Sequence, residues 1–500
     1  MGTHRPAGRR GLGNRRLGAA QIVFFVVAAA GPLLAIAGGT TTTYTVTENT
    51  GVALSFVLLA PVLALFAVGY AAMSRYITNA GAFYPYVANG IGKSTGTAVS
   101  FLTLLAYNSI QIAVHGLFGW SISNWLEAMF GVHVPWWSCT AVMIAVVGAL
   151  GVLRIDINAK VLGTALLLEV ITIGTIVVAL LTHPAGGTTS FAPLAPANLF
   201  TASAGAVFAF SVAAFTGFEG SATYGEECSD PSRTVGRATY AAIVLTAVLY
   251  TVSAFAMANA TGVDAIVAAS QAQGPGLLFA LSEQHLGTVF ANTAYVLFLT
   301  SQFACLLSFH NAIARYFFAL GREELLPERL SRTSKRTGAP IGGSLVQTAL
   351  ALAVVSVFAL AGADPVNELF AWLGTTASTG VVIIMIAVSL SVIGFFRRHQ
   401  TDESAWRRWI APSLAAILLT TVLGFILVNF DKLLGSAGSQ PWLRWGLPGL
   451  LLLSGLVGFL RAEAVRTRRP AAYDGIGGPV GADVDDGDDE PALLRLRDAR

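Results

Sequence analysis

Residues 210–237 read FSVAAFTGFEGSATYGEECSDPSRTVGR, and this stretch decides how the chain folds. An apolar run that enters from about residue 202 is interrupted at residues 216–221, where Gly217 and Gly220 flank Glu219. A carboxylate at membrane depth is costly unless it faces a cavity or a partner, and broken backbone at that depth must line protein or water. The pattern indicates a discontinuous helix of the kind that builds transporter binding sites. The alternative is a kinked helix with a buried, protonated, hydrogen-bonded Glu219.

The composition is that of a polytopic membrane protein. The chain has 500 residues, of which 54% are hydrophobic and 11% charged, against about 25% charged in soluble domains. Its mean hydropathy is +0.67. Cys139, Cys228 and Cys305 are scattered, which favours neither a disulfide framework nor a zinc site. The first apolar run follows Arg16 without a convincing cleavage site, so we interpret it as the first span.

Twelve apolar runs are long enough to cross a bilayer. They lie at 18–39, 51–73, 97–120, 136–153, 158–182, 201–227, 237–260, 287–319, 341–361, 366–395, 408–430 and 442–461. The eighth and tenth are long. With the amino terminus inside, only Lys432 and Arg444 of the 30 Lys and Arg fall in outside loops, so both termini are expected to be cytoplasmic.

The two ends of the chain differ from the middle. Residues 1–17 form a basic, Gly-rich arm, and residues 18–461 form the predicted membrane domain. Residues 462–500 contain an acidic run from Asp483 to Glu490 followed by arginines, which predicts a cytoplasmic, disordered tail.

The first span is also interrupted near its middle. It contains Ala30-Gly31-Pro32-Leu33, where the proline removes a backbone donor and the glycine lowers the cost of unwinding. The first and sixth spans are corresponding positions of two halves of five, which indicates an inverted-repeat transporter whose site lies between the breaks. Taken alone, the first interruption could be an ordinary proline kink.

Two other spans carry polar side chains. In the third, Tyr107, Gln111 and His115 share one helical face, with Asn108 beside them, and such a face is expected to point into the bundle. It either lines the solute path or makes ordinary interhelical hydrogen bonds. Glu169 lies near the centre of the fifth span, where burial disfavours a charge and a carboxyl group can take up and release a proton. The alternative is a neutral structural Glu169.

No motif for soluble-type catalysis is present in the sequence. There is no P-loop, no cluster of His and Cys with metal-ligand spacing and no Ser-His-Asp candidate with supporting context. We therefore expect no enzyme activity, no metal, no cofactor and no nucleic-acid partner.

Three segments resemble the amino acid–polyamine–organocation (APC) transporter superfamily. They are FTGFE at 215–219 with EE at 226–227 and DPSR at 230–233; RYFFALGR at 315–322 with LP at 326–327 and GAP at 338–340; and GAFY at 81–84. The resemblance covers roughly residues 18–461. It implies an all-α polytopic membrane protein of 12 transmembrane helices, with a five-plus-five inverted repeat, two further C-terminal helices, and discontinuous helices 1 and 6.

The resemblance also implies where a substrate binds. Backbone around Gly31 would hold a carboxylate, while carbonyls and side chains from Phe215 to Glu219 would meet an amino group and form an aromatic gate. The chain departs from the family in having Gly31-Pro32-Leu33-Leu34-Ala35 instead of a G-x-G run. It also has Glu169 where many members place a lysine linked to proton coupling.

These observations predict a secondary transporter of an amino acid or small amine in the cytoplasmic membrane, working by alternating access and proton symport. An exchanger and, less favoured, a non-transporting solute sensor are the alternatives. The expected substrate-binding residues are Ala30, Gly31, Pro32, Leu33, Tyr107, Asn108, Gln111, Phe215, Thr216, Gly217 and Phe218, and the expected proton-coupling or gating residues are Glu169 and Glu219. Ala213, Ala214, Tyr107 and Trp372 suggest a roomy, partly apolar pocket.

Overall fold

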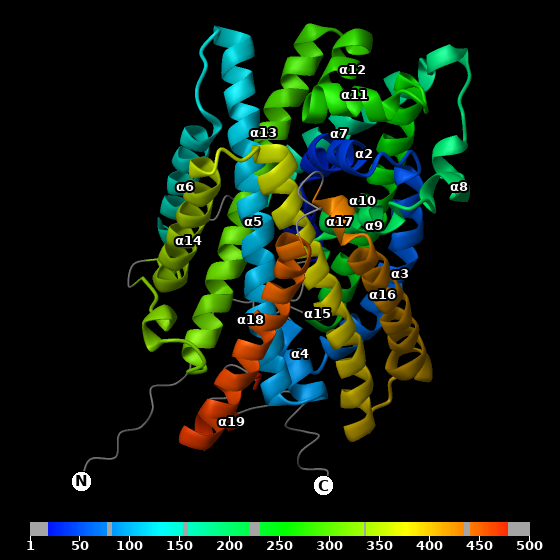
Figure 1. Cartoon of the computed structure of the whole chain (residues 1–500). Helices are drawn as coiled ribbons and strands as arrows, with labels where there is room; N and C mark the ends of the chain where they lie inside the picture. The colour runs from blue at the N-terminus through cyan, green and yellow to red at the C-terminus, as the bar shows by residue number, and fades with distance from the viewer. Residues whose placement is uncertain are drawn as a thin grey trace, which may run out of the picture.

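The computed structural model describes residues 19–77, 83–153, 159–220, 231–334, 337–434 and 441–478. In these residues the regular structure is helical, and the helices form one elongated bundle (Figure 1). Eleven helices are long and apolar enough to cross a membrane, and a shorter apolar segment at Ala204–Gly220 stands where the sixth span is expected.

The first half of the bundle follows the predicted order of spans. Its helices are α1 (Ala19–Ala30), η1 (Leu34–Thr40), α2 (Thr41–Thr47), α3 (Val52–Met73), α4 (Phe83–Gly90), α5 (Lys93–Phe130), α6 (Trp136–Leu153) and α7 (Ala159–Thr182). The third span, predicted at 97–120, is longer than expected, because α5 runs for 38 residues. The short α4, between the second and third spans, was not predicted.

The second half begins after a loop that contains η2 (Ala185–Gly187), η3 (Ala192–Leu194) and α8 (Pro196–Leu199). Its helices are α9 (Ala204–Phe215), α10 (Pro231–Thr261), α11 (Ile266–Gln273), η5 (Gly274–Gly276), α12 (Leu277–Leu286), α13 (Thr288–Arg322), η6 (Glu328–Ser331), α14 (Ile341–Leu360), η7 (Pro365–Phe370) and α15 (Ala371–Arg398). The seventh span starts earlier than predicted, at Pro231, since proline is well suited to a first helical position.

The last helices are η8 (Trp406–Ile410), α16 (Ala411–Val428), α17 (Phe430–Leu433), α18 (Pro441–Arg468) and α19 (Pro470–Asp474). The membrane domain was expected to end at residue 461, with a free tail from 462. Instead α18 continues to Arg468, and residues 469–478 pack back onto the bundle, because polar contacts far apart in sequence hold them there. The acidic run 483–490 lies outside the described residues.

The helices differ in how far they are buried. The polar residues of α5 are enclosed: Asn108, Gln111 and His115 expose 4%, 1% and 1% of their surfaces. This confirms that the polar face of the third span points into the bundle. By contrast, α18 exposes Leu452, Leu456 and other apolar side chains outward, as lipid-facing helices do. The short helices α11 and α12 lie at one end of the bundle, and α4 and α19 lie at the other (Figure 1).

Candidate functional site

The first span is interrupted at Gly31. The helix α1 ends at Ala30, and Gly31 has a φ of +54°, a left-handed conformation that glycine adopts without steric cost. Pro32 follows and contributes no N–H, and the chain then continues as the π-helix η1. The predicted break is therefore present as a short, local distortion within a segment that continues to Thr47.

Glu169 of α7 is bonded to this break. Its Oε1 accepts the backbone N–H of Leu33 at 2.6 Å and the hydroxyl of Ser301 of α13 at 2.6 Å. The side chain is buried, with 6% of Glu169 exposed. The carboxyl group thus joins α7 to the first break and to α13. The N–H of Leu33 is available to it because the break after Ala30 leaves this backbone donor without a partner in the preceding turn.

The sixth span is interrupted after Phe215, where two successive residues leave helical geometry. The helix α9 ends at Phe215, Thr216 is extended with a ψ of 130°, and Gly217 has a φ of +118°. A single helical turn follows at 218–220. A φ of +118° is strongly disfavoured for residues that carry a Cβ, which explains why a glycine stands here.

Glu219 secures this second break from within. One carboxylate oxygen accepts the N–H of Gly217 at 2.9 Å, and the other accepts the hydroxyl of Tyr107 at 2.8 Å. The carbonyl of Glu219 accepts the hydroxyl of Tyr70 of α3 at 2.6 Å. Glu219 is fully buried, and these bonds explain how a carboxyl group is accommodated inside an apolar bundle.

The two breaks lie directly against each other. A Cβ added to Gly217 would lie 3.2 Å from the backbone nitrogen of Ala30 and 3.3 Å from the Cβ of Ala29. The glycines thus allow two irregular backbone segments to approach closely in the middle of the bundle. This agrees with the predicted pairing of the first and sixth spans.

A mainly apolar cavity opens beside the paired breaks. Its volume is about 40 Å³, within about 490 Å³ of space between atoms that includes open solvent. It is lined by Ala29, Ala30, Leu34, Ala35, Gly39, Ile110, Val114, Phe210, Ala213, Ala214, Thr216, Cys305, Phe309, Phe370 and Gly374. No charged side chain is among these lining residues. The only hydroxyl, that of Thr216, donates to the carbonyl of Val212.

The structure brings only some of the predicted binding residues to the cavity. Ala30 and Thr216 line it, and Gly31, Pro32, Leu33 and Gly217 form the breaks beside it. Phe215 and Phe218 do not line it. Phe215 packs on Phe56 and Tyr250, and Phe218 packs on Phe66. The aromatic gate expected from residues 215–219 is not in position over the cavity in this structure.

The polar residues of α5 are likewise used elsewhere. Tyr107 binds Glu219, and the side-chain amide of Asn108 donates to the carbonyl of Leu104. Gln111 faces α13 and α14, where it donates to the carbonyl of Leu306 and accepts from Gln347. Ile110 and Val114, on a neighbouring face of α5, contact the cavity instead.

Three aromatic residues that sequence reasoning missed line the cavity. They are Phe210, Phe309 and Phe370. One signal in the sequence points to the first: Phe210 shares a helical face with Ala213 and Ala214, at i, i+3 and i+4, and these two alanines are expected at the pocket. Trp372, also singled out, packs on Phe358 and does not line the cavity.

The described residues contain no cluster of three or more His, Cys, Asp or Glu that would suit a metal ion. The polar groups at the two breaks are backbone N–H and C=O groups and the carboxyl groups of Glu169 and Glu219, and the cavity beside them has an apolar wall. Part of the superfamily pattern, at 81–82, 226–227 and Asp230, lies outside the described residues.

Comparison with known proteins agrees with this architecture. The chain is 24% identical over 399 residues to the branched-chain amino acid permease BcaP of Lactococcus lactis subsp. cremoris (strain MG1363), covering 75% of this chain and 80% of that protein. It is 25% identical over 263 residues to the cationic amino acid transporter 5 of Arabidopsis thaliana, covering 52% of this chain and 39% of that protein. Residues 17–451 match the amino acid permease family. The chain is therefore a multi-pass membrane protein that belongs to the amino acid permeases of the APC superfamily.

Proposed function

We propose that the protein is a secondary transporter of amino acids with apolar side chains, located in the cytoplasmic membrane with both termini inside. The observation that carries the substrate class is the cavity beside the two breaks, whose lining residues are almost all apolar. A cationic side chain would lose its hydration there without gaining a partner, at a cost of several kcal/mol. The name of the Lactococcus relative supports an aliphatic substrate.

The backbone at the two breaks is suited to the common part of an amino acid. Helix ends leave backbone donors and acceptors unsatisfied, and the carboxyl end of a helix carries partial negative charge. The carboxyl end of α9 borders the cavity through Ala213, Ala214 and Thr216, which supports binding of the ammonium group there. The segment that begins after Gly31 is the partner for the carboxylate.

The transport cycle would be alternating access in a five-plus-five inverted repeat with two additional helices. Support comes from the corresponding breaks in the first and sixth spans and from their direct contact. Glu169 would couple the cycle to protons, because protonation would change how its carboxyl group holds Leu33 and Ser301. Glu219 would act as a gating residue through Tyr107.

The test is uptake by the purified full-length protein in proteoliposomes. We expect leucine, isoleucine, valine and phenylalanine to be taken up at least about 100-fold more efficiently than lysine, and a pH gradient to drive accumulation. Uptake of lysine at a comparable rate would refute the substrate class. A loss of uptake unless the vesicles are loaded with a second amino acid would favour the exchanger.

Glu169→Gln tests the coupling separately. The amide retains an acceptor oxygen for Leu33 and Ser301 but cannot carry a transferable carboxyl proton. We expect accumulation against a gradient to be lost while exchange of internal for external amino acid continues. Glu127→Gln, at an exposed residue near the end of α5, is the matched control. Unchanged pH-dependent accumulation in Glu169→Gln would remove this residue from the coupling mechanism.

A further inference from the structure

The end of the described chain folds back across the bundle. After α18, residues 470–478 pack against α4 at the end of the molecule opposite α11 and α12 (Figure 1). We call residues 470–478 the strap. Its one large aliphatic side chain, Ile476, exposes 2% of its surface, which shows that the strap is packed onto the protein.

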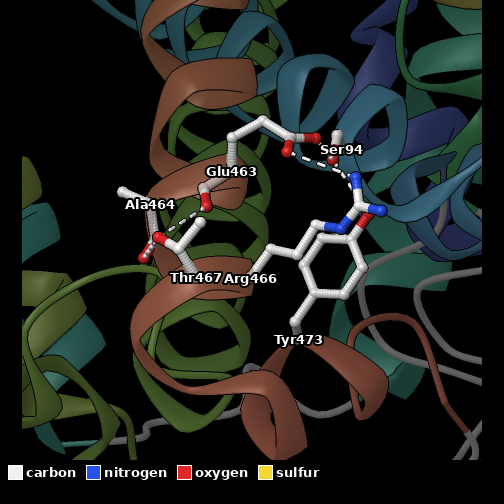
Figure 2. A network of polar contacts seen from close by, with 6 residues as sticks. All are labelled: Ser94, Glu463, Ala464, Arg466, Thr467 and Tyr473. Atoms are coloured by element: carbon white, nitrogen blue, oxygen red, sulfur yellow. Dashed lines mark hydrogen bonds and ion pairs between the residues drawn. The ribbon is translucent and has the colours of Figure 1, made fainter.

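Polar contacts fix the root of the strap. Tyr473 shares a hydrogen bond of 2.9 Å with the hydroxyl of Ser94 at the start of α5, and the guanidinium of Arg466 lies 5.7 Å from the centre of the tyrosine ring. Ser94 also donates to Glu463 of α18 at 2.6 Å. Figure 2 shows these side chains converging between α5, α18 and α19.

The tip of the strap is bonded to α4 and to the end of α13. The amide of Asn89 donates to the carbonyl of Gly477 at 2.9 Å, and the N–H of Gly477 donates to Glu323 at 3.3 Å. Gly477 has a φ of +68°, and a Cβ added there would lie 2.8 Å from the Cβ of Ala88. The strap is therefore seated on α4 at a position that only glycine fits without strain.

A continuous series of contacts leads from the strap to the break in the sixth span. Glu323 accepts the hydroxyl of Tyr84 of α4 at 2.8 Å, and the ring of Tyr84 lies 6.1 Å from that of Tyr316. Tyr316 lies 6.0 Å from Tyr107, whose hydroxyl binds Glu219. Each step is a direct hydrogen bond or an aromatic contact of ordinary geometry.

These contacts lie between the cavity and the end of the bundle that carries α4. Along α13, Tyr316 is about 10 Å beyond the cavity residue Phe309, and Glu323 is about 10 Å further, at 1.5 Å per residue. Along α5, Tyr107 lies on the same side of the cavity residue Ile110. The region between the cavity and α4 is thus filled by buried side chains, and the strap contacts its outer end at Glu323.

We propose that the strap is a closing device: seated on α4, it holds the substrate path shut at this end, and it leaves α4 when the path opens there. This inference rests on the proposed transport function. The strap joins α4, α5, α13 and α18 through the contacts above, so α4 cannot move away from the end of α13 unless Gly477 gives up its bond to Asn89 or its bond to Glu323.

Cys305 offers a direct measure of access, because it lines the cavity. In the full-length protein with Cys139→Ser and Cys228→Ser, a membrane-impermeant maleimide would be applied to oriented membrane vesicles from each face in turn. Gly477→Ala is expected to raise the labelling rate of Cys305 at least about fivefold from the face that carries α4, and not from the other face.

Gly478→Ala is the matched control, because among the described residues a Cβ there would approach Gly475 of the same turn and no other residue. In this variant Cys305 should be labelled at the same rate as in the parent protein. An unchanged rate in folded Gly477→Ala, or an equal rise from both faces, would overturn the proposal. Labelling does not require a transported solute, so a response of Cys305 without amino acid uptake would refute the transport proposal and leave the strap standing.

A cross-link that holds the strap on α4 tests the converse, namely that transport stops when the strap cannot leave α4. In Ala88→Cys with Gly477→Cys the two Cβ atoms would start 2.8 Å apart, closer than the about 3.5–4.5 Å of a disulfide, so the strap shifts outward slightly as the bond forms and is then held beside α4 by it. Oxidation should abolish leucine uptake and a reductant should restore it, while Gly477→Cys alone should not respond. A fully cross-linked protein that transports as fast as its reduced form would refute the strap.

Discussion

The two breaks at the centre of the bundle are secured in different ways. At Gly31 the free donor of Leu33 is held by Glu169, which belongs to another helix 136 residues away. At Gly217 the free donor is held by Glu219, two residues further along the same chain. One break therefore depends on the position of a neighbouring helix, and the other carries its own carboxylate and uses Tyr107 to attach it to α5.

The difference suggests a division of roles. Because Glu169 bonds both to the first break and to Ser301 of α13, a change in its protonation alters contacts among three elements at once. Glu219 forms a local cap, so its loss disturbs the fold of the break before it disturbs relations between helices. Substitutions at the two sites should accordingly separate coupling from stability.

The largest effect is expected for Glu219→Ala. It leaves the N–H of Gly217 and the hydroxyl of Tyr107 buried without their acceptor, at about 1–3 kcal/mol for each group. We expect a fall of several degrees or more in apparent melting temperature and loss of transport, measured on purified protein and in proteoliposomes. Glu219→Gln keeps one acceptor oxygen and should fall between the parent and the alanine variant. Parent-like stability of Glu219→Ala would contradict the capping role.

The sequence was sufficient to predict the breaks and most of the spans, because their signals are local. Gly31-Pro32 and Gly217 with Glu219 mark positions where a regular helix is disfavoured whatever surrounds it. Long apolar runs predict spans by the same local logic. The short helices α4 and α11 gave no such signal, since they are stabilised by the helices against which they pack.

The lining of the cavity could not be predicted as well, because it depends on how each helix is rotated about its axis. The motif at 215–219 predicts that Phe215 lies at the site, yet Phe215 packs on Phe56 and Tyr250, while Phe210 lines the cavity. The partner of Glu169 was also beyond reach, since a contact between residues 136 positions apart leaves no local trace. The same holds for the strap, whose seat is formed by α4 and α13.

A smaller effect is expected when the glycines themselves are replaced. Gly217→Ala forces a residue with a Cβ to a φ of +118°, at about 1–3 kcal/mol, and crowds Ala30. Gly31→Ala requires a φ of +54°, which costs roughly 1–2 kcal/mol, and presses on Leu34. We expect Gly217→Ala to lose more thermal stability and more leucine uptake than Gly31→Ala.

Gly220→Ala is the control for this pair, because a Cβ there meets nothing within 4 Å in the described part of the chain and its φ is not positive. It should behave like the parent in both assays. A reversed order, with Gly31→Ala the more damaging, would mean that crowding at the first break outweighs backbone strain at the second.

The smallest effects, and the sharpest comparison, come from removing one hydroxyl at each site. Tyr107→Phe and Ser301→Ala each delete a donor to a buried carboxyl group, at about 1 kcal/mol. Ser301→Ala should lose less stability, since the same oxygen of Glu169 keeps the N–H of Leu33. Ser301→Ala should nevertheless lower proton-driven accumulation while exchange persists, because it detaches Glu169 from α13, and Ser301→Thr should restore accumulation.

Tyr107→Phe should instead slow uptake and exchange together. If the two variants lowered accumulation and exchange in the same proportion, the division between a coupling carboxylate and a capping carboxylate would be lost.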